Sequence, residues 1–489
     1  MKEGLRGSGR CSPVGAGTPH ALVLVLGRLE QSPRMLAHAT ALAEVGCRVT
    51  LAGYGSVDEH HPSIQVVSLS SKAPASVHVA TSTRRCAARV LYLVLVLSAL
   101  WGRFRQALRV LEQLPPWDLL IIQNPPAFPT FFLTLWLRWR RIRRKALIVI
   151  DWHNTTHSIM AVNEAPGLAI AVARRLEYFL GKRIADAHLS VTRMLRSCLL
   201  FEMHLDPERV LVLPDRPLRA WIDRQQRHLA DEGVRLALRR AWCTRVLGCS
   251  DAALERMVTE PWLCSSTSWT PDEPMELLFQ AMAVLEREHG WSGHLFITGR
   301  GPLQSHYVET IWPKLGLHRW HLHALWLPSR ADYAELLSIA NVGISMHMSS
   351  SGMDLPMKVF DMWGCGIPVV AYSYPCLEQE LPLSRLSTEA QATKAPPEDV
   401  MGACFTDLSG LVRAIQLVKE HEERYRANIA RTCSADPTWQ WESQYERRFL
   451  PFWRMLQTSA PPESISAVRS AKSRPVNEAL HNDPHQHGE

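Results

Sequence analysis

The sequence predicts an α/β protein of two Rossmann-like, doubly wound domains that face a central cleft. Three observations support this fold class: short apolar runs end in polar residues, predicted helices separate these runs, and the alternation stops over residues 216–260 before it resumes. Apolar strands that alternate with helices are typical of parallel sheets covered on both faces. Ligands of such sheets bind beyond the carboxyl ends of the strands, so the polar residues there are the candidates for chemistry.

The length and composition are those of a globular protein with two or three domains. The chain has 489 residues, of which 46% are apolar and 21% are charged. The net charge of +7 is modest, and the aromatic-basic repeats that would indicate nucleic-acid binding are absent. Eleven cysteines without a CxxC pair predict reduced thiols, with no disulfide framework and no metal site.

The first domain is expected to span residues 20–215, after a disordered segment at residues 1–19. It opens with an apolar strand over Ala21–Leu26, and a helix follows from Pro33 to Val45, closed by Gly46. Further strands are predicted within residues 48–55, 63–69, 118–126, 146–154, 187–195 and 209–215.

The second domain is expected to span residues 261–435, after a helical linker at residues 216–260 that has no strand signal. Its strands are predicted within residues 262–270, 293–303, 321–327, 342–352 and 367–372, and its helices at about 272–288, 329–340, 356–366 and 408–430. The polar, proline-containing stretch 384–400 is predicted to be a surface insertion. Residues 436–458 are expected to form a helix that packs back across the molecule, and residues 459–489 a disordered tail.

Two segments of the first domain favour contact with a membrane surface. The apolar run Val90–Trp101 is too short to span a bilayer and lies between arginines, which fits either an interfacial helix or a buried helix. The segment Phe131–Arg144 combines tryptophans with a cluster of arginines. This combination favours the membrane interpretation, because tryptophan suits the headgroup zone and anionic lipids attract arginine.

The stretch SMHMSSSGMDLPMKVFDMWGCGIPVV, residues 345–370, contains the candidate nucleotide site. A helix that begins near Pro356 would present unpaired N–H groups and the positive end of its dipole to a diphosphate. Lys358 adds a positive charge, and Asp361, one turn later, could accept hydrogen bonds from ribose hydroxyls. The simpler alternative is a Lys–Asp surface pair on a capped helix. The loop before the helix supplies further candidates, Ser349, Ser350, Ser351 and Gly352.

Two further loops follow predicted strands and contain hydroxyl or glycine residues. The loop SSTSWT offers hydroxyl and amide donors, or it simply caps the next helix through Thr270 or Asp272. The loop TGRGPL has two glycines and an arginine, or it is a plain βα turn. Three such loops at one sheet edge favour a nucleotide-diphosphate site, with the candidates Ser265, Ser266, Thr267, Ser268, Trp269, Gly299, Arg300 and Gly301.

The first domain supplies candidates for binding a second substrate. After its first strand come Gly27, Arg28, Ser32 and Arg34. Arginines at this position could grip a pyrophosphate, or the loop is merely solvated.

The motif IDWHNTTHS follows another strand and contains candidates for acid–base chemistry. A histidine or a carboxylate there can deprotonate a hydroxyl, so either His153 or Asp151 could be the base. Asp151 could instead orient His153, and His153 could be a structural histidine bonded to backbone. Asn154 follows these two residues in the motif.

Six motifs together resemble those of the chitobiosyldiphosphodolichol β-mannosyltransferase family: GRLEQSPRM, QNPPAFP, VIDWHNTTHSIM, SSTSWT, TGRGPL and SSSGMDLPMKVFDMWGC. The resemblance covers residues 20–450 approximately, in the same order, and PMKVFD also fits the wider Pro-x-Lys-x-x-acid pattern of two-domain glycosyltransferases. It implies a GT-B fold and a role for Asp354 on the donor side. On the acceptor side it implies Arg34, Asn124, Asp151, His153 and Glu177, where Glu177 either lines the cleft or pairs with Arg174.

The resemblance also implies the reaction and its place in the cell. Mannose would pass from GDP-mannose to dolichyl-diphosphate-linked chitobiose with inversion, at the cytosolic face of the endoplasmic reticulum membrane. The implied enzyme needs no metal and no cofactor, since GDP-mannose is a substrate, and other mannosyltransferases of the dolichol pathway are candidate partners. Nucleic acid is not an expected partner.

The chain departs from the family pattern at its start, at Met353, in the 384–400 insertion and in the tail. Members commonly begin with an apolar anchor that this chain lacks, so attachment is expected from Val90–Trp101 and Phe131–Arg144, unless the start of the gene model is wrong. Met353 replaces the acid that the wider α-transferases have eight residues before Asp361, which fits an inverting enzyme. The alternatives are a non-catalytic paralogue that scaffolds a membrane glycosyltransferase complex, another dolichol-pathway glycosyltransferase and a UDP-sugar enzyme of the same fold.

Overall fold

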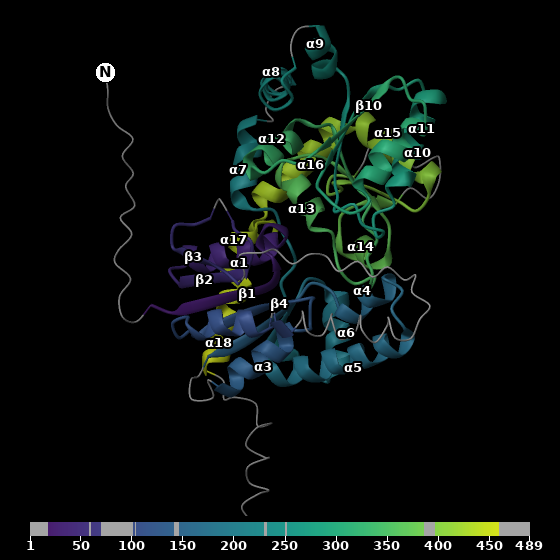
Figure 1. Cartoon of the computed structure of the whole chain (residues 1–489). Helices are drawn as coiled ribbons and strands as arrows, with labels where there is room; N and C mark the ends of the chain where they lie inside the picture. Colours follow the sequence, from purple (N-terminus) through teal and green to yellow (C-terminus); the bar gives the residue numbers. More distant parts are fainter. Residues whose placement is uncertain are drawn as a thin grey trace, which may run out of the picture.

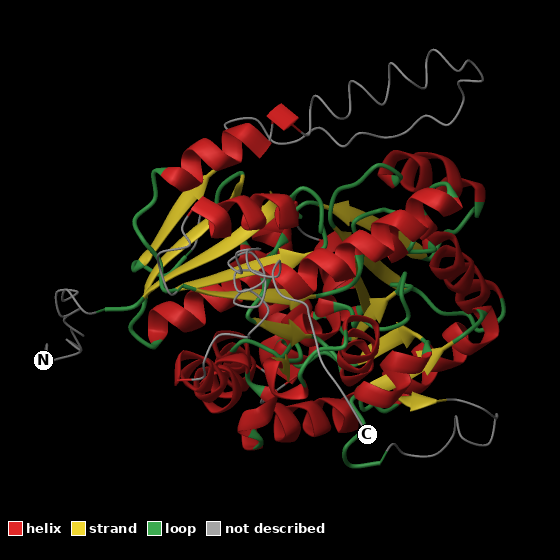
Figure 2. Ribbon diagram, turned by 90° about the horizontal axis from the view of Figure 1, so that it is seen from below, coloured by secondary structure: helices red, strands yellow, loops and turns green. Residues whose placement is uncertain are grey.

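The chain folds into two α/β domains, one above the other in the computed structural model of Figure 1. The structure describes residues 18–57, 60–69, 101–102, 104–140, 146–228, 232–249, 252–385 and 397–458. Each domain contains one seven-stranded parallel sheet. Figure 2 shows the strands (yellow) flanked by helices (red), which confirms the predicted doubly wound fold class.

The first sheet has the strand order β3-β2-β1-β4-β5-β6-β7. Its strands are β1 (His20–Arg28), β2 (Arg48–Tyr54), β3 (Ile64–Ser68), β4 (Leu119–Asn124), β5 (Leu147–Trp152), β6 (Ala187–Ser190) and β7 (Val210–Val212). Its helices are α1 (Pro33–Glu44), α3 (Thr130–Arg140), α4 (Thr156–Val162), α5 (Gly167–Ile184) and α6 (Arg193–Met203), and residues 104–112 are also helical. The strand order reverses between β1 and β4, which is the ligand-binding point of such sheets.

The second sheet repeats this arrangement in the order β10-β9-β8-β11-β12-β14-β13. Its strands are β8 (Trp262–Ser266), β9 (Gly293–Thr298), β10 (Trp320–Leu325), β11 (Val342–Ser345), β12 (Val369–Tyr372), β13 (Ser384–Arg385) and β14 (Gly402–Phe405). Its helices are α10 (Met275–Arg287), α11 (Trp312–Lys314), α12 (Arg330–Ile339), α13 (Met357–Gly364), α14 (Pro375–Glu380), α15 (Leu408–Glu420) and α16 (Glu422–Ala435). Here the order reverses between β8 and β11.

Both sheets are buried on both faces, which is why their strands are apolar without alternation. In β1, Val23 packs into one hydrophobic core and its neighbour Leu24 into another, on the opposite side of the sheet. In β8, Cys264 and Leu263 likewise belong to two different cores. Removing such side chains from water is the main stabilising contribution to a fold of this kind.

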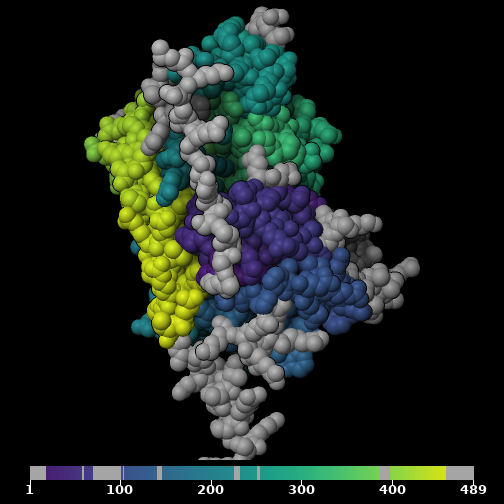
Figure 3. Space-filling view, turned by 90° about the vertical axis from the view of Figure 1, so that its left-hand side faces the viewer, coloured from purple at the N-terminus to yellow at the C-terminus, as the bar shows by residue number. Residues whose placement is uncertain are grey.

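Helices connect the two domains and return from the second to the first. The linker forms α7 (Arg219–His228), α8 (Glu232–Trp242), a π-helical turn (Cys243–Leu247) and α9 (Ala252–Thr259), as the absence of a strand signal predicts. The C-terminal segment forms α17 (Trp441–Gln444), a π-helical turn (Tyr445–Phe449) and α18 (Leu450–Thr458). Figure 3 shows this segment (yellow) running down one side of the molecule onto the first domain. Its Trp441 indole donates to the Ala37 carbonyl of α1 at 3.1 Å.

Three predicted elements differ from the structure. The helix expected over residues 408–430 is two helices, because His421 leaves the helical conformation between α15 and α16. Strands β13 and β14 were not expected, since two- and four-residue strands are too short for a periodic signal, and β13 lies inside the predicted insertion 384–400. Helix α10 starts at Met275 with Pro274 as its N-cap, so neither Thr270 nor Asp272 caps it.

The segment Phe131–Arg144 begins with an ordinary sheet-covering helix. In α3, Phe131 and Leu137 are buried in the core, whereas Phe132 and Trp139 are exposed on the opposite side. No helix in the described ranges is both long and apolar enough to cross a membrane. Residues 90–100 of the other predicted membrane segment lie outside the described residues, as do residues 141–145, 386–396, 1–17 and 459–489. The cysteines of the described part of the chain are free thiols, as predicted.

We predict that Trp441→Ala lowers the free energy of unfolding by about 3–5 kcal/mol. Trp441 is buried, stacks edge-on against His38 and lies under the Arg34 guanidinium. Its loss leaves a cavity between the C-terminal segment and α1. Denaturant unfolding checks this, with exposed Trp139→Ala as the control that changes the free energy by at most about 1 kcal/mol. Equal effects of the two substitutions would show that the C-terminal segment is not docked through Trp441.

Candidate functional site

The two domains touch through loops at the carboxyl ends of their strands. The Asn154 amide, just after β5, donates to the Ser350 hydroxyl at 3.0 Å, and Ser158 lies 3.1 Å from the same hydroxyl. One strand further along, the Thr192 hydroxyl donates to the Met353 carbonyl at 2.5 Å. The ligand-binding edges of both sheets therefore meet, as the facing arrangement in Figure 1 shows.

Lys358 points into the second sheet from the first turn of α13. Its ammonium donates to the Ser266 carbonyl at the end of β8, at 2.7 Å, and forms an ion pair with Glu273. The side chain is 17% exposed. An ammonium has three N–H donors, so these two contacts leave one donor for a ligand. Lys358 is thus held at the place where the strand order reverses, between β8 and β11, and at the amino end of α13.

The loops SSTSWT and TGRGPL lie against each other with no room for side chains at the two glycines. Gly299 has a φ of +128°, and a Cβ there would lie 1.9 Å from the Thr267 carbonyl oxygen. A Cβ on Gly301 would lie 1.7 Å from the Ser268 carbonyl oxygen. The Leu303 amide also donates to the Trp269 carbonyl at 3.1 Å. The predicted convergence of these two loops is therefore present.

Asp354 organises the serine loop. Its carboxylate accepts hydrogen bonds from Ser349 and, at 3.5 Å, from Ser351. It also accepts from His347 Nε2 at 3.2 Å, while Asp272 lies 3.5 Å from the other ring nitrogen. Burial alone would lower the pKa of His347, but hydrogen bonds to the Asp272 and Asp354 carboxylates raise this pKa to about 9. His347 therefore carries a positive charge at neutral pH, one strand end away from Lys358.

Asp361 is a carboxylate with no hydrogen bond among the described residues. It is partly buried one turn after Lys358. Burial raises the pKa of Asp361 to about 7, opposed by the Arg330 guanidinium and assisted by the Asp215 carboxylate. An acid in this state can accept hydrogen bonds from a ligand that compensates for its lost hydration.

Asp151, at the end of β5, is buried at the centre of four polar contacts. Arg34 on α1 donates to both of its oxygens, at 2.8 Å from Nε and 3.0 Å from Nη2. Nε2 of His38 lies 3.0 Å from Oδ2, and Nε2 of His153 lies 2.8 Å from the same oxygen. Burial alone would raise the pKa of Asp151, but the Arg34 guanidinium, with His153 and His38, holds this pKa well below its usual range. Asp151 is therefore a permanent carboxylate that accepts hydrogen bonds.

Glu177 is fully buried on α5 and holds the loop after β5 in place. Its carboxylate accepts from the Asn124 amide at 2.9 Å and from the Thr156 backbone N–H at 2.8 Å. His157 Nδ1 lies 2.8 Å from the same carboxylate. Arg174, the alternative partner from sequence, pairs with Glu202 instead. Glu177 and Asn124 thus support the loop that carries His153 and Asn154.

Several predicted site residues have structural positions that correct their expected roles. Arg34 already pairs with Asp151 and Asp215, and its side chain is 1% exposed. It therefore cannot bind a pyrophosphate. Ser265 lies within strand β8 and Trp269 lies in the hydrophobic core. Their exposed fractions are 1% and 0%, so neither side chain faces a donor.

The remaining predicted residues lie at or near the loops that meet. Arg28 is exposed at the end of β1, next to Gly27, and Ser32 donates to the Arg28 carbonyl at 3.0 Å. Arg300 is exposed and lies over the Trp326 ring at 4.9 Å. Gly352 has a φ of +71°, a left-handed conformation that suits glycine in the serine loop.

Sequence reasoning missed four residues that connect the site: Glu273, His347, Asp215 and His38. Each pairs with a partner far along the chain, such as Asp215 with Arg34 across 181 residues. No local spacing reveals such a pair, although Asp215 does stand at a predicted strand end. Within the described ranges, no cluster of three histidine, cysteine or acidic side chains is placed to hold a metal ion.

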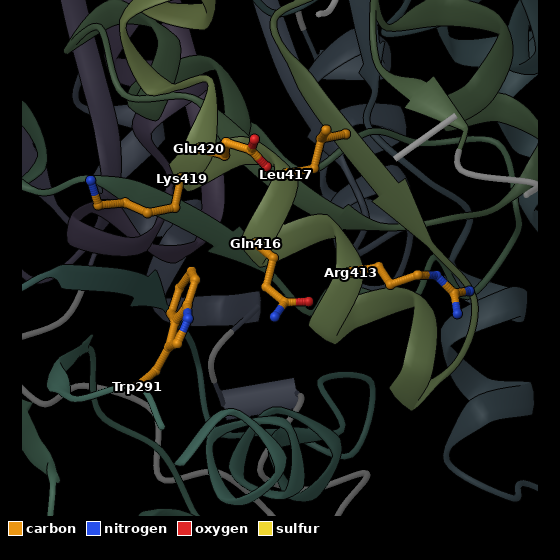
Figure 4. A pocket seen from close by; sticks show the side chains of 6 residues that line it. All are labelled: Trp291, Arg413, Gln416, Leu417, Lys419 and Glu420. Carbon is orange, nitrogen blue, oxygen red and sulfur yellow. The ribbon is translucent and has the colours of Figure 1, made fainter. Parts of the chain in front are cut away.

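A surface pocket lies elsewhere in the second domain, lined by Trp291, Arg413, Gln416, Leu417, Lys419 and Glu420 (Figure 4). Trp291 precedes β9, and the other residues belong to the second half of α15, which returns antiparallel to the strands. The pocket therefore lies at the amino edge of the sheet, opposite the loops described above.

Comparison with known proteins gives relatives along most of the chain. A protein of Yarrowia lipolytica named chitobiosyldiphosphodolichol beta-mannosyltransferase is 32% identical over 79% of this chain and 78% of its own length. A relative of the same name from Candida glabrata is 31% identical over 73% of this chain and 76% of its own. The Arabidopsis thaliana protein named UDP-glycosyltransferase TURAN is 31% identical over 73% and 83%. No family model matches the chain.

Solved structures with the same fold include glycosyltransferases. Sucrose-phosphate synthase from Thermosynechococcus elongatus has a TM-score of 0.57 at 16% identity, over 90% of this chain and 100% of that chain. The catalytic domain of starch synthase IV from Arabidopsis thaliana has a TM-score of 0.56 at 12% identity, over 90% and 100%. These likenesses show the GT-B fold. Together with the sequence relatives, they show that the chain is a glycosyltransferase and belongs to the chitobiosyldiphosphodolichol β-mannosyltransferase family.

Proposed function

We propose that the chain transfers mannose from GDP-mannose to dolichyl-diphosphate-linked chitobiose with inversion, at the cytosolic face of the endoplasmic reticulum membrane. The family supports the mannosyl product and the lipid-linked acceptor, because its members carry both in their name. The observation that carries the proposal is the contact between Asn154 and Ser350. It joins the loop that carries His153 in one domain to the serine loop that precedes Lys358 in the other, and transfer between two substrates requires such proximity.

The second domain suits the departing nucleoside diphosphate. The amino end of α13 carries the positive end of a helix dipole, and Lys358 adds its ammonium at the same place. The imidazolium of His347 lies behind the serine loop. Negative charge builds on the diphosphate as the glycosidic bond breaks, so fixed donors here stabilise the transition state more than the ground state. Asp361, one turn along α13, is the acceptor for ribose hydroxyls.

His153 is the residue of the first domain best suited to act as base. Since Asp151 is an ionised acceptor, the His153 Nε2 that faces it must carry the proton. The neutral ring then presents Nδ1 as an acceptor, and no described residue hydrogen-bonds to it. His153 is 21% exposed, whereas Asp151 is fully buried. His153 Nδ1 therefore takes the proton from the attacking 4-hydroxyl of the terminal N-acetylglucosamine, and Asp151 stabilises the resulting imidazolium.

A UDP-sugar is the alternative donor. One observation favours it, namely that the Arabidopsis relative is named a UDP-glycosyltransferase. The nucleoside-diphosphate parts of the two donors differ only in the base, since ribose and diphosphate are common to both. A direct comparison of donors therefore separates them. A scaffold without activity would bind GDP and form no product.

We predict that purified protein forms product from GDP-mannose and a phytanyl-diphosphate chitobiose, and little from UDP-sugars. Lys358→Ala should lower kcat about 100-fold, because the leaving diphosphate loses a fixed positive charge. The exposed Lys314→Ala is the matched control and should keep the wild-type rate. Absence of product with wild-type protein, or full activity of Lys358→Ala, would refute the proposed function.

The base assignment predicts that His153→Ala lowers kcat by about 100-fold to 10,000-fold while the affinity for GDP stays within about twofold. Asp151→Asn should lower kcat as well, because the neutral amide lacks the negative charge that stabilises the imidazolium form of the ring. Steady-state kinetics and GDP binding measure the two effects, with exposed His306→Ala as the control. A His153→Ala enzyme with normal kcat would eliminate His153 as the base.

The pKa of Asp361 predicts that GDP binds more weakly in acid. As the pH falls through about 7, Asp361 is protonated and loses its charge as acceptor for the ribose hydroxyls. The dissociation constant should rise about tenfold between about pH 8 and about pH 6, relative to that of Asp361→Asn. GDP itself titrates in this range, and its titration affects both proteins equally, so the ratio of the two dissociation constants removes this effect. Parallel pH profiles of the two proteins would exclude a role for Asp361 in binding.

A further inference from the structure

Large apolar side chains are exposed on two helices of the first domain. We call this surface the α3–α5 face and define it by Phe132, Leu135, Trp139, Leu168, Val172, Leu176 and Phe179. Leu168 is 79% exposed, Trp139 62% and Phe179 52%. Large apolar side chains exposed on two neighbouring helices indicate a binding surface for a partner or a membrane.

The apolar residues form stripes because of their helical spacing. On α5, Leu168, Val172, Leu176 and Phe179 follow one another at intervals of four, four and three, so they share one side of the helix. The opposite side, with Glu177 and Ile184, is buried and anchors α5 to the domain. Helices α3 and α5 pack together at the bottom of the first domain in Figure 1, on the side away from the second domain.

The exposed charges on the two helices of this face are positive, whereas acids such as Glu112 and Glu164 lie on neighbouring segments. Helix α3 has no acidic residue, and the only acid of α5 is the buried Glu177. Arg175, Lys182 and Arg183 are exposed beside the apolar stripe, and the Arg183 guanidinium lies 3.7 Å from the centre of the Phe179 ring. Nearby, Arg174 is paired with Glu202 of α6. Aromatic and aliphatic side chains bordered by cations match the interface of an anionic bilayer in both polarity and charge.

We propose that the α3–α5 face docks on an anionic lipid bilayer, with the apolar stripe in the boundary between headgroups and acyl chains. The cations at its border contact lipid phosphates. On the inner side of α5, Glu177 holds the loop that carries His153, through Asn124 and the Thr156 N–H. Docking therefore sets the height of the base above the membrane. This step deepens the proposed function and rests on it, because only a lipid-linked acceptor makes that height matter.

The test is sedimentation of the full chain with phosphatidylcholine vesicles that contain or lack phosphatidylserine. Wild-type protein should bind the anionic vesicles, and the double variant Leu168→Glu/Phe179→Glu should bind at least about tenfold more weakly. Val234→Glu is the matched control, since Val234 is also exposed and lies on α8 of the linker. Thermal unfolding verifies that the exposed substitutions leave the fold intact. Equal binding of both variants, or no binding by wild type, overturns the proposal.

A second measurement separates this proposal from the proposed function. The double variant should transfer mannose to a short, water-soluble acceptor at the wild-type rate, and to a vesicle-embedded acceptor at least about tenfold more slowly. Vesicle binding without any product would refute the reaction and leave the docking surface standing. A dimer in solution that the double variant dissociates would assign the face to a second copy and overturn membrane docking.

Discussion

The ion pair between Arg34 and Asp151 is the contact on which the first half of the site depends. Both groups are removed from water, so each needs the other, and losing one partner of such a pair costs about 3–5 kcal/mol. The pair connects α1 to the ends of β5 and β7, since Arg34 also binds Asp215 and the Leu213 carbonyl. The C-terminal segment closes over it through Trp441. Helix α1 thereby holds in place the carboxylate that faces His153.

In the second domain, backbone contacts between loops hold the site residues in place. Its two glycine positions allow the loops after β8 and β9 to touch, and Glu273 fastens one of them through the Thr267 hydroxyl at 2.5 Å and the Ser268 N–H at 2.8 Å. Lys358 joins this network from α13. Each domain thus presents a preorganised group, and Ser350 brings the two together. Proximity of fixed groups is a large part of what a transferase contributes to its rate.

Most of the fold was accessible from the sequence, because both sheets are buried and their apolar strands end in recognisable polar loops. The short strand Gly402–Phe405 was not, since four residues show no period. Among the site residues, Lys358 stood in a predicted helix and His153 at a predicted strand end, and the structure places both residues there. Arg34 was recognised as a residue of the site, but its expected role was wrong. The sequence next to a strand end is the same whether an arginine there faces solvent or pairs with a buried aspartate. Pairs of residues that lie far apart along the chain, such as Asp215 and Arg34, can be identified only in the three-dimensional structure.

The central claim is that an ionised, buried Asp151 sets the tautomer of His153. Nitrogen-15 NMR of histidine-labelled protein tests it directly, with His153→Gln used to assign the signals. The claim predicts that neutral His153 carries its proton on Nε2, leaving Nδ1 with the shift of an unprotonated ring nitrogen. A neutral His153 protonated on Nδ1 would contradict it, because the nitrogen meant to accept the proton would already hold one.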